Sequence, residues 1–190
     1  MRVLLVEGPT DAKFLAGLLG INDLNTASMV AQKIVSGYRC YSHKDVLICE
    51  GGGKYNVCKR AIELDKLLTE KKYNFEVYVL LDGDAKEIEC DVGDTFHLNS
   101  RNLEELVFLS AFKVLSTHDY ALHLLEKEKD NADSKLKAYL LMYLIKKYEA
   151  PGENWTDISS FLYFVGKTYK EQLLSHDESL HRLFELLSNG

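Results

Sequence analysis

The stretch from Val77 to Asp84 constrains the fold of this chain more than any other. It reads VYVLLDGD, a run of five apolar residues followed by two carboxylates that one glycine separates. An uninterrupted apolar run of this length predicts a strand that is buried on both faces, as in a parallel sheet covered by helices. Ligands of such sheets bind outside the carboxyl ends of the strands, and this is where Asp82 and Asp84 fall.

A third carboxylate is expected at the same edge of the sheet. A second apolar run, at residues 3–6, ends in Glu7. Carboxylates that lie close together repel each other unless a cation lies among them. Hard oxygen ligands of this kind suit Mg²⁺ or Mn²⁺. The sequence therefore predicts a divalent metal site formed by Glu7, Asp82 and Asp84.

Composition limits the class of protein. The 190 residues are 46% hydrophobic and 27% charged, which predicts one domain, or one domain with a small appendage, and a packed core. The formal net charge of −6 means that contact with a polyanion needs a local basic patch. The apolar run after Met1 is too short for a signal peptide or a membrane span, so we predict a cytoplasmic protein with no membrane partner. No CxxC pair occurs, and we predict reduced thiols, rather than disulfides or a zinc site, at Cys40, Cys49, Cys58 and Cys90.

The predicted secondary structure changes after about residue 101, from alternating strands and helices to helices alone. Before it, the predicted strands lie at residues 3–6, 46–49, 76–81 and 95–98. The helices between them are predicted at residues 10–19, 27–35 and 55–68. This alternation indicates a mostly parallel α/β sheet with helices on both faces. Beyond it the apolar spacing is helical throughout, with helices predicted at residues 103–115, 119–127, 134–148, 158–174 and 177–187.

Three segments of the chain resemble the Toprim domain of topoisomerases, bacterial-type primases, small ribonucleases and overcoming-lysogenization-defect (OLD) nucleases. The segment VLLVEGPTD at residues 3–11 is similar to the first family motif in its OLD-like version, where an acid, here Asp11, follows the glutamate by four residues. VLLDGD at residues 79–84 looks like the second motif. RNLEEL at residues 101–106 is similar to the segment in which a glutamate, here Glu104, opens a helix.

The resemblance implies a Toprim-like, Rossmann-like α/β domain at residues 1–112, followed by a helical C-terminal extension or cap at residues 113–190. It also implies Mg²⁺-dependent phosphodiester chemistry on DNA or RNA, as a small stand-alone nuclease with one or two metals. Asp82 and Asp84 would hold the metal, and Glu7 would be a further ligand or the general acid/base. The same family pattern would place a second metal at Asp11 and Glu104.

Each of these acids also has a plainer interpretation. Asp82 and Asp84 are typical of a solvated turn, because Asp and Gly favour turns. Glu7 could serve as a capping or hinge acid. Asp11 and Glu104 could simply be favourable charges at helix N-termini.

A glycine-rich segment, Gly51 to Lys54, lies between a predicted strand and a predicted helix. Glycine lets backbone amides approach a phosphate, so Gly52, Gly53 and Lys54 are candidate phosphate-binding residues. The segment is not a Walker loop, and a flexible turn is the alternative. Basic residues could form a local patch near this segment; the candidates are Lys13, Arg39, Lys44, Lys59, Arg60 and Arg101. The alternative is that most of them are ordinary solvated surface charges.

Two other functions compete with a nuclease. In the first, the site holds metal and a nucleic acid or nucleotide without turnover, and the helical half recruits a protein partner. In the second, a phosphatase or receiver-like fold uses Asp82 as an aspartyl nucleophile. The second is disfavoured because the DGD segment comes third in the order of predicted strands. The six histidines show no metal-ligand spacing.

Overall fold

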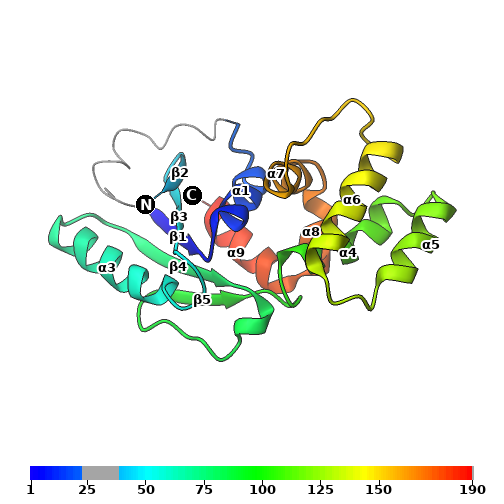
Figure 1. The fold of residues 1–190 in the computed structure, drawn as a ribbon. Helices are drawn as coiled ribbons and strands as arrows, with labels where there is room; N and C mark the ends of the chain where they lie inside the picture. Colours follow the sequence, from blue (N-terminus) through cyan, green and yellow to red (C-terminus); the bar gives the residue numbers. More distant parts are fainter. Residues whose placement is uncertain (23–38, 190) are drawn as a thin grey trace.

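The computed structural model describes residues 1–22 and 39–189 (Figure 1). Within them, five strands form one sheet in the order β2-β3-β1-β4-β5. Its four parallel strands are β1 (Arg2–Val6), β3 (Val46–Glu50), β4 (Glu76–Leu81) and β5 (Asp94–His97). The predicted α/β class with a mostly parallel sheet is confirmed. The helix predicted at residues 27–35 lies outside the described residues.

The edge strand β2 (Cys40–His43) was not predicted. It runs antiparallel to β3, and a tight turn at Lys44 and Asp45 joins the two strands. Lys44 adopts a positive φ of 52°, which non-glycine residues seldom do. Only the first residue of β2 is buried, so the strand lacks the apolar alternation that would have revealed it.

Most helices lie close to their predicted positions. In the first half they are α1 (Pro9–Leu18) and α3 (Val57–Glu70). In the second half they are α4 (Leu103–Val114), α5 (Asp119–Glu128), α6 (Ser134–Tyr148), α7 (Ile158–Thr168), α8 (Lys170–His176) and α9 (Glu178–Ser188). The single helix predicted at 158–174 is thus two helices, because the backbone leaves helical geometry at Tyr169. No helix in the described ranges has the length and apolar character needed to cross a membrane.

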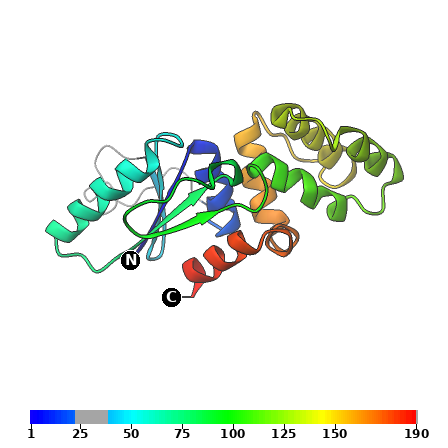
Figure 2. The same ribbon diagram turned by 90° about the horizontal axis from the view of Figure 1, so that it is seen from below.

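The sheet separates two hydrophobic clusters (Figure 2). On one face, Leu5 and Val79 pack against the apolar side of α3. On the other face, Leu4 and Leu80 belong to a larger cluster that includes α1 and the C-terminal helices. Alternate residues of a strand point to opposite faces, so the continuous apolar strands supply both clusters.

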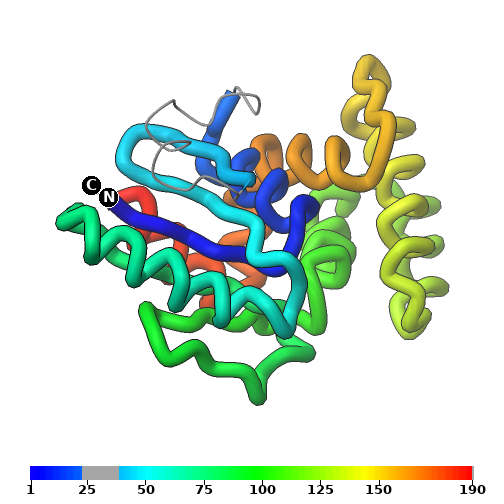
Figure 3. Tube along the Cα trace, turned by 60° about the vertical axis from the view of Figure 1, so that its left-hand side comes forward, coloured from blue at the N-terminus to red at the C-terminus, as the bar shows by residue number. Residues whose placement is uncertain are grey.

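The helical half packs directly on the α/β half. Helix α7 lies beside α1 (Figure 3), at a contact too close for side chains larger than glycine. A Cβ atom at Gly17 would lie 2.2 Å from the carbonyl oxygen of Tyr163, and one at Gly166 would lie 2.5 Å from that of Phe14. One hydrophobic cluster therefore runs across residue 112, while the division into domains at that point stays a prediction.

All four cysteines form disulfides, so the prediction of reduced thiols is wrong. Cys40 pairs with Cys49, and Cys58 pairs with Cys90. The first pair arises because the two residues face each other across β2 and β3, a strand pairing that the sequence pattern did not reveal. Disulfides are most frequent in oxidising compartments, so the cysteines do not support the predicted cytoplasmic location, which stays a prediction.

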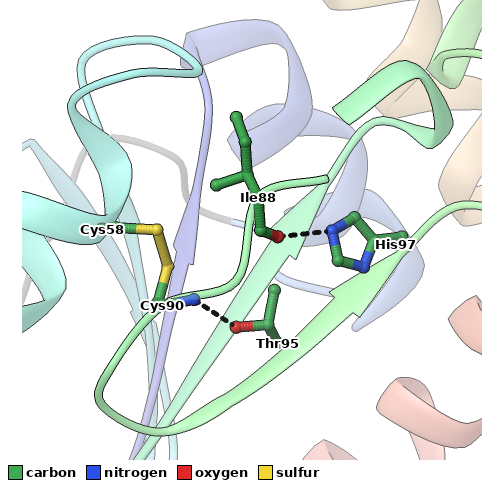
Figure 4. Close-up of a disulfide and its surroundings, with 5 residues drawn as sticks. All are labelled: Cys58, Ile88, Cys90, Thr95 and His97. Atoms are coloured by element: carbon green, nitrogen blue, oxygen red, sulfur yellow. Dashed lines mark hydrogen bonds between the residues drawn. A yellow bond between two sulfur atoms is a disulfide. The ribbon is translucent and has the colours of Figure 1, made fainter. Parts of the chain in front are cut away.

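The second disulfide anchors the loop between β4 and β5 (Figure 4). Cys58 lies in the first turn of α3, and Cys90 lies in the loop. The backbone N–H of Cys90 donates to Oγ1 of Thr95 at 3.2 Å, and the ring Nε2 of His97 donates to the carbonyl oxygen of Ile88 at 2.8 Å. These links hold the chain that follows Asp84 against the sheet.

Candidate metal centre

The structure places Glu7 and Asp82 side by side at the carboxyl edge of the sheet. Strands β1 and β4 are parallel neighbours, and each acid directly follows its strand. Oε1 of Glu7 accepts a hydrogen bond from the backbone N–H of Asp82 at 3.0 Å. Glu7 therefore joins the ends of the two central strands.

Asp11 lies in the first turn of α1, behind Glu7. Its Oδ2 accepts a hydrogen bond from the backbone N–H of Gly8 at 2.9 Å, which closes the turn before the helix. The pKa of the Asp11 carboxyl is raised to about 7, mainly by burial. The hydrogen bond from Gly8 lowers this pKa, and the charges of Glu7 and Glu104 raise it. Glu104, in the first turn of α4, thus belongs to the same group of acids.

Asp82 is the electrostatic centre of the group. Burial raises its pKa to about 8, and the charges of the four other acids contribute to the rise. In order of effect these acids are Asp11, Glu7, Glu104 and Asp84. Carboxylates that are withdrawn from water and repel one another bind protons more tightly, and a cation would relieve the same repulsion.

Apolar side chains beneath the acids explain why Asp11 and Asp82 are withdrawn from water. Glu7, Asp11 and Asp82 line a small cavity of about 10 Å³, whose other walls are apolar. These walls come from α1, the sheet, the loop after β5 and α4, with Phe14, Leu15, Leu80, Leu81, Leu98 and Leu103 as members. The carboxylates therefore have hydrocarbon beneath them and solvent on one side only.

Asp84 lies farther out, in the 3₁₀ turn Gly83–Ala85. Its backbone N–H donates to the carbonyl oxygen of Arg101 at 3.0 Å, which holds the turn against the loop after β5. The contact is close, because a Cβ atom at Gly83 would lie 2.1 Å from the carbonyl oxygen of Ser100. Glycine between the two aspartates is therefore required by packing as well as compatible with a turn.

The predicted phosphate-binding segment reaches the same edge. Nζ of Lys54 lies 3.1 Å from the carbonyl oxygen of Asp84 and 3.4 Å from its Oδ1. It also lies 3.8 Å from Oε1 of Glu87. The structure thus brings Lys54 together with the acids, as an ion pair with one of them.

The glycines of this segment serve the fold. Gly52 and Gly53 have φ angles of 77° and 97°, which glycine adopts without strain. The N–H of Gly53 donates to the carbonyl oxygen of Glu7 at 2.7 Å, so this amide is already occupied. Arg60 packs against Gly52 and donates from Nη1 to the carbonyl oxygen of Glu50 at 3.0 Å. Of the predicted basic patch, Arg60 and Arg101 lie near this edge, as does the phosphate-binding candidate Lys54. Lys44 lies in the hairpin turn at the opposite end of β3.

The donor set fits a hard divalent cation in its chemistry. Within residues 1–22 and 39–189, no three His, Cys, Asp or Glu side chains stand in an arrangement that would hold a metal ion as it is. One oxygen each of Glu7 and Asp11 is bonded to a backbone N–H, which leaves Oε2 and Oδ1 for a ligand. Binding of a metal ion would therefore require the side chains of Asp82 and the neighbouring acids to rotate toward one shared position.

Two residues of this edge were missed by sequence reasoning. Tyr55, directly after Lys54, is 85% exposed, and no apolar periodicity marks it. Asp177 is fully buried, accepting the backbone N–H of Asn99 at 2.7 Å and that of Leu180 at 2.9 Å. Its place before a helix predicts a cap, but only the fold reveals that it also holds the loop after β5.

A much larger cavity lies elsewhere. It has a volume of about 630 Å³ and lies at the amino edge of the sheet, where Arg2 and Tyr78 meet Arg182 of α9. None of the five acids lines it. In parallel sheets the chemistry gathers at the carboxyl edge, so we place the candidate site with the acids.

Comparisons of the chain with protein-family models, with curated proteins and with solved structures give no significant match. The likeness to the Toprim domain therefore rests on the motifs of the sequence.

Proposed function

We propose that the carboxyl edge of the sheet binds Mg²⁺ or Mn²⁺ and that the protein is a small Toprim-like nuclease. The observation that supports this most strongly is the grouping of five acids, with burial and mutual repulsion raising the pKa of Asp82 to about 8. Such strongly perturbed acids are typical of functional sites, and a divalent cation would neutralise them.

In this proposal Asp82, Asp84 and Glu7 hold the first metal, and Asp11 and Glu104 complete a second position. A bound divalent ion would stabilise charge on the phosphate and lower the pKa of a water molecule. The protein's own contribution is to hold these carboxylates on rigid strand ends and helix starts. Asp82 would carry a proton during the reaction, since a carboxyl with a pKa near neutrality is suited to this. Glu7 is the alternative by position, because it accepts the backbone N–H of Asp82.

Two cationic side chains and one aromatic ring provide contacts for the substrate. Lys54 places positive charge beside Asp84, and Arg60 places a second charge on the neighbouring glycine segment. An acidic protein needs such local positive charge if it is to approach a phosphodiester. Tyr55 offers a largely exposed ring on which a base can stack. We propose DNA or RNA as the substrate on these grounds.

The test is a cleavage assay on labelled single- and double-stranded DNA and RNA, with Mg²⁺, with Mn²⁺ and with a chelator. The Asp82→Ala variant should lose metal-dependent cleavage while keeping its fold. Asp130→Ala is the matched control, because Asp130 is exposed at the end of α5, outside the acid group. Cleavage that persists in Asp82→Ala, or that ignores the chelator, would contradict the proposal.

A second function is a non-catalytic module that binds metal together with a nucleic acid or nucleotide and recruits a protein partner. Two observations favour it: Lys54 is paired with Asp84, and the described acids do not form a ready coordination set. Mg²⁺-dependent binding of an oligonucleotide without any cleavage by well-folded protein would support this function over the nuclease.

A further inference from the structure

Helix α6 carries an exposed stripe that has no acidic residue. Its sequence, SKLKAYLLMYLIKKY, contains four lysines and three tyrosines but neither Asp nor Glu, in a protein with a net charge of −6. Residues spaced by four are neighbours on one side of a helix, and four residues of α6 have this spacing: Lys135, Tyr139, Tyr143 and Lys147. What we call the α6 stripe comprises the exposed residues of this helix, which are Lys135, Leu136, Tyr139, Tyr143, Lys146 and Lys147.

The rings of the stripe are open to solvent. Tyr139 is 57% and Tyr143 is 56% exposed, and Tyr120 of the neighbouring helix α5 is 57% exposed. Nζ of Lys147 lies 5.5 Å from the ring centroid of Tyr120, 5.7 Å from that of Tyr143 and 5.1 Å from that of Tyr148. The surface thus combines exposed aromatic faces with a cation that lies among them.

Carboxylates at the two ends of α6 are already engaged. Asp133 caps the helix, where its side chain accepts the backbone N–H groups of Lys135 and Leu136, both at 3.0 Å. Glu149 pairs with Nε2 of His118 at 3.1 Å. Nζ of Lys146 contacts the neutral Oδ1 of Asn154 at 3.4 Å, and Lys147 contacts tyrosine side chains. The charges of these two lysines are therefore not neutralised by the acids that flank the helix.

The α6 stripe begins beside the N-terminal end of α4, the helix that follows the carboxyl edge of the sheet (Figure 1). Nδ2 of Asn102 donates to Oγ of Ser134 at 2.9 Å, and Asn102 is the residue that caps α4 next to Glu104. Lys137 holds the two helices together, with its Nζ 3.6 Å from Oε2 of Glu105. From that point α6 extends away over its 15 residues, about 22 Å, a length that about six stacked nucleotides would cover.

We propose that the α6 stripe, together with Tyr120, binds single-stranded nucleic acid. Bases would stack on the tyrosine rings while Lys135, Lys146 and Lys147 contact phosphates, which is how sequence-tolerant single-strand binding surfaces work. Paired bases in a duplex hide these faces, so a single strand fits the surface better. The proposal deepens the proposed function by giving its substrate class, and it rests on that function for the choice of a nucleic acid.

The test is the affinity of the full chain for fluorescein-labelled oligo(dT) and oligo(U) of about 15 nucleotides, measured by fluorescence anisotropy with EDTA present to prevent cleavage. The double variant Tyr139→Ala, Tyr143→Ala should bind at least about tenfold more weakly than the wild type. Tyr73→Ala is the matched control, because Tyr73 is a 44% exposed tyrosine that follows α3 and lies outside the stripe. It should bind as the wild type does.

A lysine variant tests the electrostatic part of the proposal. Lys146→Ala with Lys147→Ala should reduce the slope of log affinity against log salt by about 1.4, because each phosphate contact on a single strand contributes about 0.7. Lys66→Ala, on the exposed side of α3, is the control and should leave the slope unchanged. A duplex of equal length should bind the wild type more weakly than the single strand.

Three results would overturn the proposal. The first is that the wild type does not bind single strands. The second is that the Tyr73→Ala control loses as much affinity as the double tyrosine variant. The third is that the wild type binds no nucleic acid but self-associates, and that the double tyrosine variant does not. Hydrolysis of a small phosphodiester, bis(p-nitrophenyl) phosphate, tests the proposed function separately, because so small a substrate does not need the α6 stripe. If the wild type binds single strands but does not hydrolyse this substrate, the nuclease is contradicted and the α6 stripe is not.

Discussion

Replacing Asp82 by asparagine is expected to stabilise the metal-free protein at pH 8. Asparagine keeps the shape of the side chain but removes the charge, which burial and the neighbouring carboxylates both disfavour. A candidate active-site residue whose removal makes the protein more stable would show that the acids are held together against their own repulsion. The prediction therefore examines the electrostatics of the site independently of any activity.

The magnitude follows from the pKa of Asp82, which rises from 3.8 to about 8 on folding. One pKa unit corresponds to about 1.4 kcal/mol, so a rise of about four units would cost about 5 kcal/mol at pH 8, where the folded carboxyl is about half ionised. The side chain is partly exposed, so water reduces this cost of burial and repulsion. We expect the variant to gain about 2 kcal/mol in the free energy of unfolding, which would move the urea midpoint upward by about 1 M.

The dependence on pH has a definite sign. Because the folded pKa lies above the unfolded one, the folded protein binds more protons between about pH 4 and pH 8. The wild type should therefore lose stability as pH rises through this window, and Asp82→Asn should lose less. Below about pH 4 the carboxyl is protonated in both states, so the two proteins should converge.

The assay is urea unfolding in EDTA, followed by circular dichroism from pH 4 to pH 8, with Asp130→Asn as control. Adding Mg²⁺ should stabilise the wild type at pH 8 more than it stabilises Asp82→Asn, because the wild type offers the charge that the ion neutralises. An Asp82→Asn variant that is less stable than the wild type at pH 8, or that keeps the full slope with pH, would refute the reasoning.

Three further predictions concern other parts of the structure. Replacing both Cys58 and Cys90 by serine should lower the free energy of unfolding by about 3–4 kcal/mol, because their disulfide closes a long loop; thiol titration of the unreduced, unfolded wild type should find no free thiol. Gly83→Ala should destabilise the protein by about 1–3 kcal/mol or more in urea unfolding, since its Cβ would meet backbone, while Gly152→Ala, where a Cβ meets nothing within 4 Å, should not. Lys54→Met should raise KM for an oligonucleotide in the cleavage assay with little change in stability; an unchanged KM would remove Lys54 from substrate binding.

The parallel core of the fold was predictable because its strands are long apolar runs. The bounds of β4 agree with the prediction at residues 76–81, and those of β1 differ by one residue. The edge strand β2 was not predicted, because only Cys40 in it is buried and an edge strand needs no apolar alternation. The Cys40–Cys49 disulfide was missed for the same reason, since this pairing depends on β2.

The candidate site was predictable to the extent that parallel topology determines it. Neighbouring parallel strands end together, so Glu7 and Asp82 had to lie side by side, and they do. The contact of Lys54 with Asp84 depends on the path of two loops, which no periodicity encodes. The exposure of Tyr55 is likewise a property of the folded surface.

Binding of Mn²⁺ tests the central claim most directly. Electron paramagnetic resonance measures the free ion while wild-type protein, the Asp82→Asn, Asp84→Asn double variant and the Asp130→Asn control are titrated at pH 8. We expect one or two bound ions for the wild type and the control, competition by Mg²⁺, and loss of binding in the double variant. Equal binding by all three proteins, or none by the folded wild type, would contradict a metal centre at this edge of the sheet.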